Sequence, residues 1–445
     1  MSTNNTTEPS MTDEIIEWAT EELWAFKVEV AVLVILGGAF YEGSRYLGYW
    51  PTGVILGGLI GSILTFSQTR HAVGRLFRWS SWSRRFNKAL DSQDSVIAKK
   101  RPTLIQVERF NCGVRLTLSL ASGTSLEEFE KLASYLAVHF GAREVRMDRA
   151  KTNASIVVCA IYMQDPFEGK EFTWTSAKGV RQPTSAWDPI PIGIDRDGNE
   201  VKLSLIERNL LIGGEPGSGK SVALNVVIAN LAQCSDVAVH LFDAKSVELE
   251  AWTQIAAGFV GPNIDDAIAQ LRRLRSMMED RYRFLGQQRA RKLHRKHRLN
   301  LIVVVIDELP FYVANPDRSK AREFGDILGD LIARGRAAGI IFVVAAQKPS
   351  ADTLPSAIRD LINLRLAFRC STKEASDTIL GGGWASAGFS AATIGINNRG
   401  VGWLLGESGQ PELIRVYLID DVTIAQIVEE NSSRFRDKEG EDQWN

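Results

Sequence analysis

A glycine-rich loop is the part of this sequence best suited to chemistry. The stretch GGEPGSGKS occupies residues 213–221 and fits the pattern G-x-x-x-x-G-K-[ST]. Glycines in such a loop let backbone N–H groups surround an anion, and the next helix directs its positive end at the same point. The pattern predicts that Lys220 contacts the β- and γ-phosphates of ATP and that Ser221 binds Mg²⁺. The predicted nucleotide contacts are Gly214, Glu215, Pro216, Gly217, Ser218, Gly219, Lys220, Ser221 and Val222.

An acidic pair supplies the second half of this predicted site. The apolar run LIVVVIDEL ends in Asp307 and Glu308. Asp307 is expected to hold Mg²⁺ through water, and Glu308 to orient or deprotonate the attacking water. A further apolar run, GIIFVVAAQ, ends in Gln347, a polar residue that can respond to the γ-phosphate. The alternative is that two carboxylates merely end a strand. The pattern predicts ATP hydrolysis, since no acceptor site or lid of a kinase-like transferase is recognisable.

The elements around these residues alternate between strand and helix. NLLIGG before the loop is typical of a buried strand, and SVALNVVIANLA after it is typical of a helix. This alternation, from about residue 190, predicts an α/β fold with a parallel sheet and helices on both faces. We therefore expect a P-loop (RecA-like) ATPase domain at residues 190–430, after a connector at 166–189 and before a tail at 431–445.

A small α+β domain is predicted at residues 101–165, between that connector and the N-terminal part. GVRLTLSL alternates apolar and polar residues and predicts a half-buried strand. The next helix is predicted to begin at a capping box formed by Ser125 and Glu128 and to end at Gly141. SIVVCAIYM predicts another strand. No residue of this small domain suggests catalysis.

The N-terminal part has the pattern of a membrane anchor. Residues 46–66 carry no charge over 21 positions, enough for one transmembrane helix. After an acidic tail at 1–22, residues 23–67 are predicted to form a transmembrane hairpin; one span plus a surface helix, or a buried core helix, is the alternative. The linker at 68–100 is rich in Arg and Lys, which by the positive-inside rule places the remaining chain on the cytoplasmic side of a bacterial cell membrane.

Overall charge and cysteine content narrow the function classes. The net charge of −1 gives no general sign of nucleic-acid binding, so any DNA-facing surface must be local. The four cysteines form no CxxC pair, which argues against a zinc ribbon or a disulfide framework. Residues 271–298 carry 11 Lys and Arg against 2 acidic residues. This basic segment either lines a DNA path or packs on the outside of an assembly.

Several motifs in order resemble the FtsK/SpoIIIE family of bacterial DNA translocases. They are NLLIGGEPGSGKSVALNVVIANLA, LFDAKSVELEAW, VVVIDEL and the long run from ARGRAAG to the end of SDTIL. The lead-in IPIGIDRDGNEVKLSL and the small domain add to the likeness, which covers residues 103–430. The resemblance implies a homo-hexameric ring around double-stranded DNA, with ATP bound between subunits.

The resemblance also implies that an arginine from the neighbouring subunit completes each ATP site. Arg336 in ARGRAAG is the first candidate, followed by Arg369 and Arg365. Asp243 and Lys245 match a strand-end motif of the family near the nucleotide. Candidates for contacts with DNA in the ring, in competition with the basic segment, are Arg318, Lys320, Arg322, Lys348 and Arg359.

Two differences from the cell-division members of the family affect the expected role. The linker after the predicted spans is short, and only 25 residues follow LIRVYLID, fewer than a winged-helix domain needs. This domain organisation is more similar to that of the Tra-type transfer proteins of actinobacterial plasmids and integrative elements. The resemblance implies conjugal DNA transfer, with additional transfer-channel proteins as partners. Chromosome segregation at the septum, type VII-like protein export and a membrane-tethered docking scaffold are the alternatives.

Overall fold

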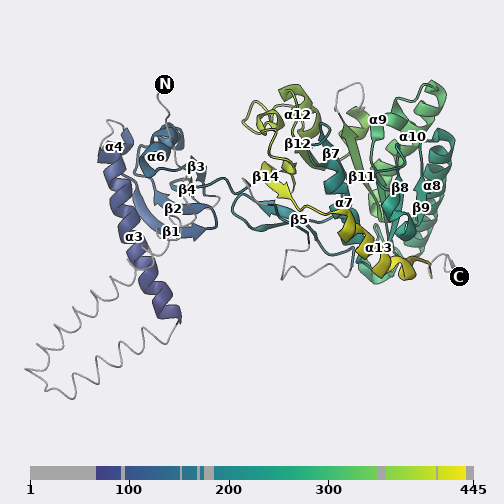
Figure 1. The fold of residues 1–445 in the computed structure, drawn as a ribbon, viewed down its shortest axis with the longest axis horizontal. Helices are drawn as coiled ribbons and strands as arrows, with labels where there is room; N and C mark the ends of the chain where they lie inside the picture. The colour runs from purple at the N-terminus through teal and green to yellow at the C-terminus, as the bar shows by residue number, and fades with distance from the viewer. Residues whose placement is uncertain are drawn as a thin grey trace, which may run out of the picture. The chain divides into compact units, whose positions relative to one another are not determined.

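The computed structural model describes residues 67–91, 96–150, 153–167, 171–174, 185–347, 356–406 and 409–436 (Figure 1). The chain divides into two compact units, Met1–Met163 and Gln164–Asn445, each with its own hydrophobic core. The predicted transmembrane hairpin at 23–67 lies, apart from Ser67, outside the described residues. None of the helices within the described ranges is long and apolar enough to cross a bilayer.

The first unit contains a four-stranded antiparallel sheet of strand order β1-β2-β4-β3. Helices pack against this sheet around a shared apolar core. Its elements are α3 (Ser67–Asp91), α4 (Val96–Lys99), β1 (Thr103–Phe110), β2 (Gly113–Ser119), α5 (Leu126–Glu130), α6 (Ala133–Phe140), β3 (Glu144–Arg149) and β4 (Ile156–Tyr162).

Local sequence explains much of this unit. Alternate residues of β2 are buried, as the pattern predicts. Ser125 and Glu128 form the predicted capping box, with the Ser125 hydroxyl accepting from the Glu128 N–H at 3.2 Å. Gly141 ends α6 with a left-handed φ of 63°. The predicted single helix is, however, interrupted between α5 and α6, and the strands β1 and β3 were not predicted.

Helix α3 corrects the prediction that residues 68–100 are a linker. Its residues Phe86 and Leu90 are 1% and 0% exposed and belong to the core of the first unit. The Tyr135 hydroxyl of α6 also donates to the Ala89 carbonyl at 3.1 Å. The C-terminal part of α3 is therefore a structural part of the small domain.

The second unit is built on a ten-stranded sheet of order β6-β5-β14-β13-β12-β7-β11-β10-β8-β9. The six strands from β12 to β9 are parallel, and the other four extend the sheet in antiparallel fashion. The strands are β5 (Ile190–Asp195), β6 (Glu200–Leu203), β7 (Leu210–Gly214), β8 (Val237–Phe242), β9 (Gly258–Val260), β10 (Leu301–Ile306), β11 (Ile340–Gln347), β12 (Leu364–Phe368), β13 (Val401–Leu405) and β14 (Pro411–Val416). The sheet is thus mixed, and the prediction of a parallel sheet holds for its central part.

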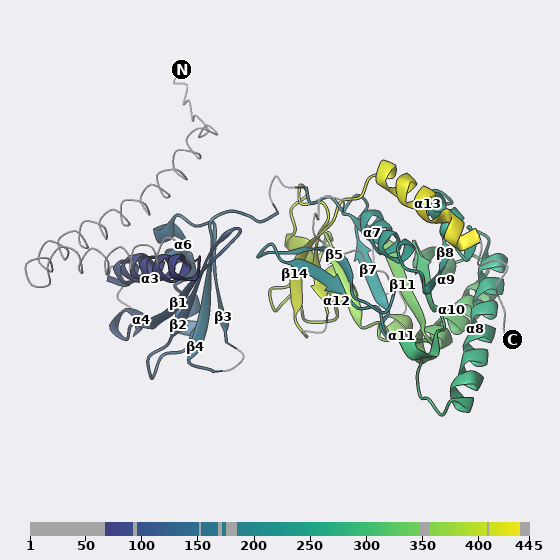
Figure 2. The ribbon, with the colours of Figure 1, turned by 90° about the horizontal axis from the view of Figure 1, so that it is seen from below.

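Helices cover both faces of this sheet and shield its central strands from solvent (Figures 1 and 2). Helices α7 and α13 lie on one face, and α8 and α10 on the other. Burial on both faces explains why β7, β10 and β11 are almost continuously apolar. The helices are α7 (Lys220–Ala232), η1 (Glu250–Ile255), α8 (Ile264–Gln287), η2 (Arg295–His297), α9 (Leu309–Val313), α10 (Arg318–Arg334), η3 (Gly335–Ala338), α11 (Ser356–Arg359), α12 (Lys373–Leu380), η4 (Ala391–Thr393) and α13 (Asp421–Arg436).

Candidate active site

The glycine-rich loop follows β7 directly and leads into α7. Gly219 has a φ of 122°, a conformation that residues with a Cβ rarely adopt. A Cβ added there would also lie 2.8 Å from the Cα of Gly400. Gly214 has a φ of 150°, and its Cβ would lie 2.8 Å from both the Phe368 Cβ and the Ser218 Oγ. The loop conformation therefore depends on glycine at these two positions.

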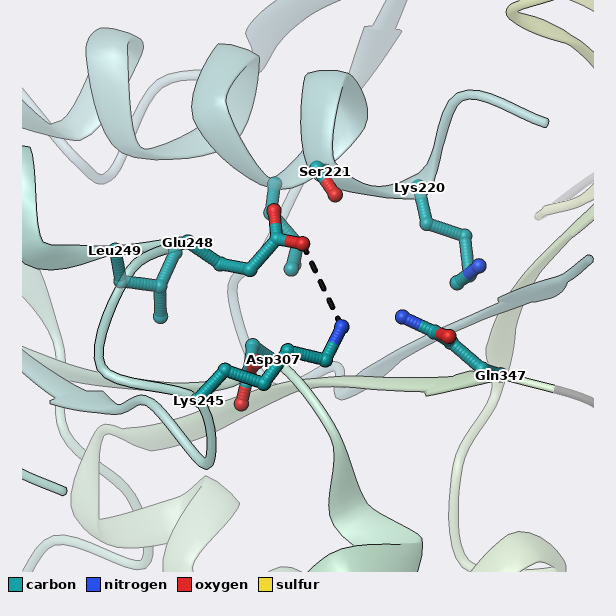
Figure 3. A pocket seen from close by; sticks show the side chains of 8 residues that line it. Lys220, Ser221, Lys245, Glu248, Leu249, Asp307 and Gln347 are labelled. Atoms are coloured by element: carbon teal, nitrogen blue, oxygen red, sulfur yellow. Dashed lines mark ion pairs between the residues drawn. The ribbon is translucent and has the colours of Figure 1, made fainter. Parts of the chain in front are cut away.

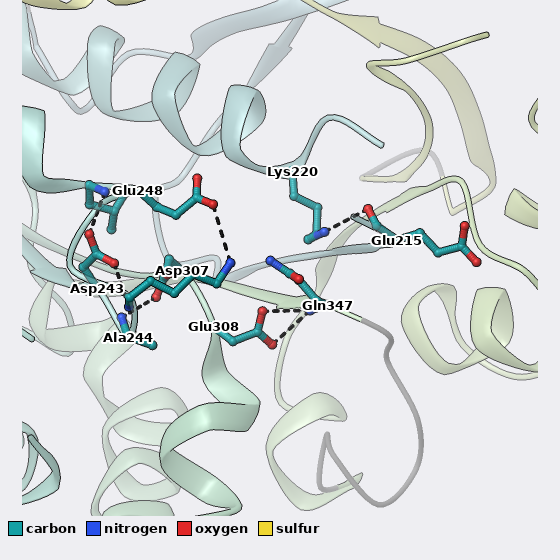
Figure 4. Close-up of polar contacts among 10 residues, drawn as sticks. Glu215, Lys220, Asp243, Ala244, Glu248, Asp307, Glu308 and Gln347 are labelled. Atoms are coloured by element: carbon teal, nitrogen blue, oxygen red, sulfur yellow. Dashed lines mark hydrogen bonds and ion pairs between the residues drawn. The ribbon is translucent and has the colours of Figure 1, made fainter. Parts of the chain in front are cut away.

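Lys220 is the first residue of α7 and is only 5% exposed. Its Nζ donates to the Glu215 carbonyl oxygen of the same loop at 3.0 Å (Figure 4). Burial lowers the pKa of Lys220, and the nearby Glu308 carboxylate partly offsets this effect. A buried ammonium that is held only by a loop carbonyl can exchange this partner for a phosphate oxygen.

The acidic pair lies at the end of β10, two strands away from β7 across the sheet. Asp307 is 6% exposed, and its Oδ1 accepts a hydrogen bond from the Ala244 N–H at 2.9 Å. Burial, with the nearby carboxylates of Asp243 and Glu308 adding to it, raises the pKa of Asp307 to about 7. Because burial and the neighbouring carboxylates disfavour the ionised form of Asp307, a cation bound beside it would be stabilising.

Glu308 lies beside the end of β11. The backbone N–H of Gln347 donates to Glu308 Oε1 at 3.1 Å and to Oε2 at 3.3 Å (Figure 4). Burial raises the pKa of Glu308, while the Gln347 N–H and then the Lys220 charge oppose this rise. A carboxylate of raised pKa that is fixed by a backbone contact suits a general base.

One cleft brings Lys220, Asp307 and Gln347 together (Figure 3). Its empty space, open to solvent, is about 270 Å³. The residues lining it are Lys220, Ser221, Leu224, Lys245, Glu248, Leu249, Asp307 and Gln347. Strands β7, β8, β10 and β11 are neighbours in the parallel sheet, so their carboxyl ends meet at this edge.

The end of β8 supports the floor of the cleft. Asp243 is fully buried, and its carboxylate accepts from the N–H groups of Lys245 at 3.0 Å and Leu249 at 2.8 Å. These bonds shape the turn that carries Lys245 and Glu248, whose side chains form an ion pair at 3.5 Å. Asp243 is therefore a positioning residue, and Lys245 points into the cleft (Figure 3). Sequence reasoning did not identify Glu248.

The oxygen donors of the cleft fit a magnesium ion. The Ser221 hydroxyl and the Asp307 carboxylate line the same space, and Mg²⁺ prefers such hard oxygen ligands while keeping several waters. The raised pKa of Asp307 agrees with a carboxylate whose charge a cation would balance. Within the described residues no cluster of three or more His, Cys, Asp or Glu side chains forms a closed metal cage.

The other predicted loop residues differ in exposure. Pro216 and Gly217 are exposed, whereas Glu215 and Val222 are half-buried. Ser218 is buried, and its hydroxyl donates to the Glu215 carbonyl at 2.6 Å. Sequence reasoning did not identify Gly400, whose N–H donates to the Ser218 carbonyl at 2.9 Å. No motif in the sequence marks Gly400 as a neighbour of the loop.

The three candidate arginines lie in different environments. Arg336 belongs to η3, ahead of the eight-residue strand β11, so it lies roughly 25 Å from the Gln347 end of that strand. The Arg369 guanidinium pairs with Glu215 of the loop at 2.5 Å. The Arg365 side chain donates to the Ile362 carbonyl at 3.0 Å and the Arg359 carbonyl at 3.1 Å. Arg336 is therefore remote from the cleft of its own subunit.

Many cations of the predicted DNA-contacting segments are already engaged. Arg281 is buried in α8 and donates to the Ala338 carbonyl at 2.8 Å. Other cations pair as Arg272 with Glu323, Arg283 with Asp280, Lys320 with Asp265, Arg322 with Asp326 and Arg359 with Asp360. Arg318 begins α10, and Lys348 lies outside the described residues. These pairings reduce, without removing, the charge that is available to a polyanion.

Comparison with known proteins assigns a family to this site. Residues 165–380, which include the loop, the acidic pair and Gln347, match the family described as FtsK/SpoIIIE. The chain carries an FtsK/SpoIIIE-family domain. It is 29% identical over 285 residues to the DNA translocase FtsK of Lactococcus lactis subsp. cremoris and 29% identical over 305 residues to that of Lactiplantibacillus plantarum. These matches cover 59% and 62% of this chain but only 37% of each relative.

A solved structure supports the fold. The pCW3 conjugation coupling protein TcpA, in a monomer form with ATPγS, matches with a TM-score of 0.52 and 18% identity. The match covers 79% of this chain and 99% of that one. At this level of identity the likeness concerns the fold alone. The match of residues 165–380 to the family model confirms the predicted resemblance to the FtsK/SpoIIIE family.

Proposed function

We propose that this protein is a membrane-anchored, ATP-driven translocase of double-stranded DNA that works as a homo-hexameric ring. The observation that carries the proposal is the convergence of Lys220, Ser221, Asp307, Glu308 and Gln347 on one sheet edge within an FtsK/SpoIIIE-family domain. The curated relatives, which are named DNA translocases, support DNA as the substrate. The uncharged residues 46–66 support the anchor, with the motor on the cytoplasmic side of a bacterial membrane.

Each side chain of the site has a separate role in the proposed ATP hydrolysis. Lys220 leaves the Glu215 carbonyl and neutralises charge on the transferred phosphoryl group. Glu308, fixed by the Gln347 N–H, accepts a proton from the attacking water. Ser221 and Asp307 would hold Mg²⁺, which would supply Lewis-acid stabilisation of the phosphate oxygens. Because the Gln347 N–H at the end of β11 donates to the Glu308 carboxylate, a change in the charge of Glu308 would alter its hydrogen bonds to that strand.

Arg336 is proposed to act on the neighbouring subunit. It lies at the amino end of β11, far from its own cleft, and in a ring it would have to reach the site of the next protomer. Arg369 is a weaker candidate because it is paired with Glu215 in its own subunit. We rank Arg336 first for the role of stabilising transition-state charge in trans.

Conjugal transfer is the proposed biological setting. TcpA, named a conjugation coupling protein, matches this fold over 79% of the chain. Additional transfer-channel proteins would then be partners. Chromosome segregation at the septum is the second candidate, because the curated relatives are FtsK proteins.

The test is ATP hydrolysis by a fragment that begins at Ser67. It should not begin near Arg101, because Phe86 and Leu90 of α3 complete the core of the small domain. Turnover is measured with and without long linear duplex DNA, with Lys220→Ala as the blank. Stimulation by duplex, but not by single strands or by protein extracts, is expected. Turnover that an assembled ring shows equally with and without duplex would contradict the proposal and favour protein export.

A further inference from the structure

The loop at residues 395–400 lies directly against the phosphate-binding loop. The Gly400 N–H donates to the Ser218 carbonyl at 2.9 Å, and a Cβ on Gly219 would lie 2.8 Å from the Gly400 Cα. These two contacts involve backbone on both sides. The 395–400 loop is therefore held at a fixed distance from the glycines that are proposed to surround the phosphates.

The 395–400 loop lies on the side of the phosphate-binding loop that the hydrolytic residues do not occupy. In the sheet, β7 stands between β11 and β12, and β13, which follows Gly400, is next to β12. Glu308 and Gln347 belong to the β10 and β11 side. A nucleotide with its terminal phosphate beside Glu308 would therefore extend its ribose and base toward residues 395–400.

The side chains of this loop suit that end of a nucleotide. Arg399 is exposed, and among the described residues no hydrogen bond or ion pair engages its guanidinium. Ile396 is 70% exposed, which is unusual for a large apolar side chain. By contrast, Arg369 and Lys245, two partly exposed cations near the phosphate-binding loop, are each paired with a glutamate. An exposed cation and an exposed apolar side chain on one loop fit a phosphate joined to a nucleoside.

We propose that residues 395–400 form the second wall of the nucleotide site. Arg399 binds the phosphate nearest the ribose, and Ile396 packs against the base. This inference rests on the proposed ATP-dependent function and adds a binding role for a segment outside the matched family domain, which ends at residue 380. Arg399 acts in its own subunit, unlike the arginine proposed to act in trans.

Equilibrium binding of a fluorescent ATP analogue to the full chain in detergent, without DNA, tests the proposal. Tripolyphosphate serves as a competitor that has phosphates but no base. Arg399→Ala is expected to weaken both ligands about tenfold, the usual consequence of losing one charge-assisted contact. Ile396→Ala is expected to weaken the ATP analogue several-fold and to leave tripolyphosphate unchanged. Arg399→Lys should retain part of the affinity for both ligands.

Arg149→Ala is the matched control, because Arg149 is an exposed arginine of β3 in the first unit, which contributes no residue to the nucleotide site. Its affinities should equal those of the wild type. Nucleotide affinity of Arg399→Ala within twofold of this control would overturn the proposal, even if duplex-stimulated turnover changed. Equal ATP binding by the wild type and Lys220→Ala would instead show that the proposed function itself is wrong.

Discussion

The buried carboxylate of Asp307 makes a quantitative prediction about stability and pH. Its pKa is raised from 3.8 to about 7, chiefly by burial. Since the folded protein binds this proton more tightly than the unfolded chain, Asp307 lowers the free energy of unfolding progressively as the pH rises from about 3.8 to about 7. At one pKa unit per 1.36 kcal/mol, the full loss is about 4 kcal/mol.

The substitution Asp307→Asn should remove this loss. Asparagine keeps the shape and can still accept the hydrogen bond from the Ala244 N–H. The loss due to Asp307 is about 1.5 kcal/mol at pH 5 and about 4 kcal/mol at pH 8. Allowing for partial screening in an open cleft, the stability of the variant relative to the wild type should increase by about 2 kcal/mol between these pH values.

Urea unfolding of a fragment that begins at Gln164, without Mg²⁺ or nucleotide, measures this difference. The fragment contains the whole core of the second unit. Asp326→Asn is the control, because the Asp326 side chain is 76% exposed and the change should be nearly neutral at both pH values. If Asp307→Asn and the wild type lose stability in parallel between pH 5 and pH 8, the argument from burial is refuted. With Mg²⁺ and ATP present, the wild type should gain more stability than the variant.

Three further substitutions test other parts of the site. Glu308→Gln should bind the nucleotide yet hydrolyse it at least about 100-fold more slowly, because the proton acceptor is lost; equal turnover would exclude Glu308 as the base. Gly219→Ala should abolish nucleotide binding because its Cβ would clash with Gly400, whereas Gly325→Ala in helix α10, whose Cβ would meet no atom within 4 Å, should retain binding; this pair is compared by fluorescent-nucleotide titration. Arg281→Met should destabilise the second unit by about 2–4 kcal/mol in urea, since it leaves buried carbonyl groups without donors; a neutral effect would contradict that role.

The sequence predicted the phosphate-binding half of the site because its signals are local. A strand, a glycine-rich turn and a helix follow one another within about 25 residues, so the residues that form this half of the site are also neighbours in the sequence. Asp307 and Glu308 could be predicted because an apolar strand ends at them. Both signals depend on the rule that parallel strands present their carboxyl ends at one edge.

The contact between Gly400 and the loop could not be predicted in this way. It joins residues 218 and 400 through the position of β13 in the sheet, and no local pattern records which strand lies next to which. The same limit applies to the strands β1 and β3. Both strands lie at the edges of the sheet and carry charged residues, such as those of VRMDR, so their sequences lack the apolar pattern that predicts a strand. The role of α3 in the first core was not predicted, because the many Arg and Lys residues of 68–100 indicated a linker next to the membrane and not a packed helix.

The charge balance of the cleft favours a bound cation. Among the described residues of the cleft, the carboxylates of Asp243, Glu248, Asp307 and Glu308 outnumber the ammonium groups of Lys220 and Lys245. Burial raises the pKa of Asp307 and Glu308 and lowers that of Lys220, so each group is displaced toward its neutral form. Triphosphate alone would add negative charge to this excess. Mg²⁺ entering with the triphosphate would offset part of this negative charge and favour the ionised form of Asp307, so we expect the cleft to bind the metal–nucleotide complex in preference to the free triphosphate.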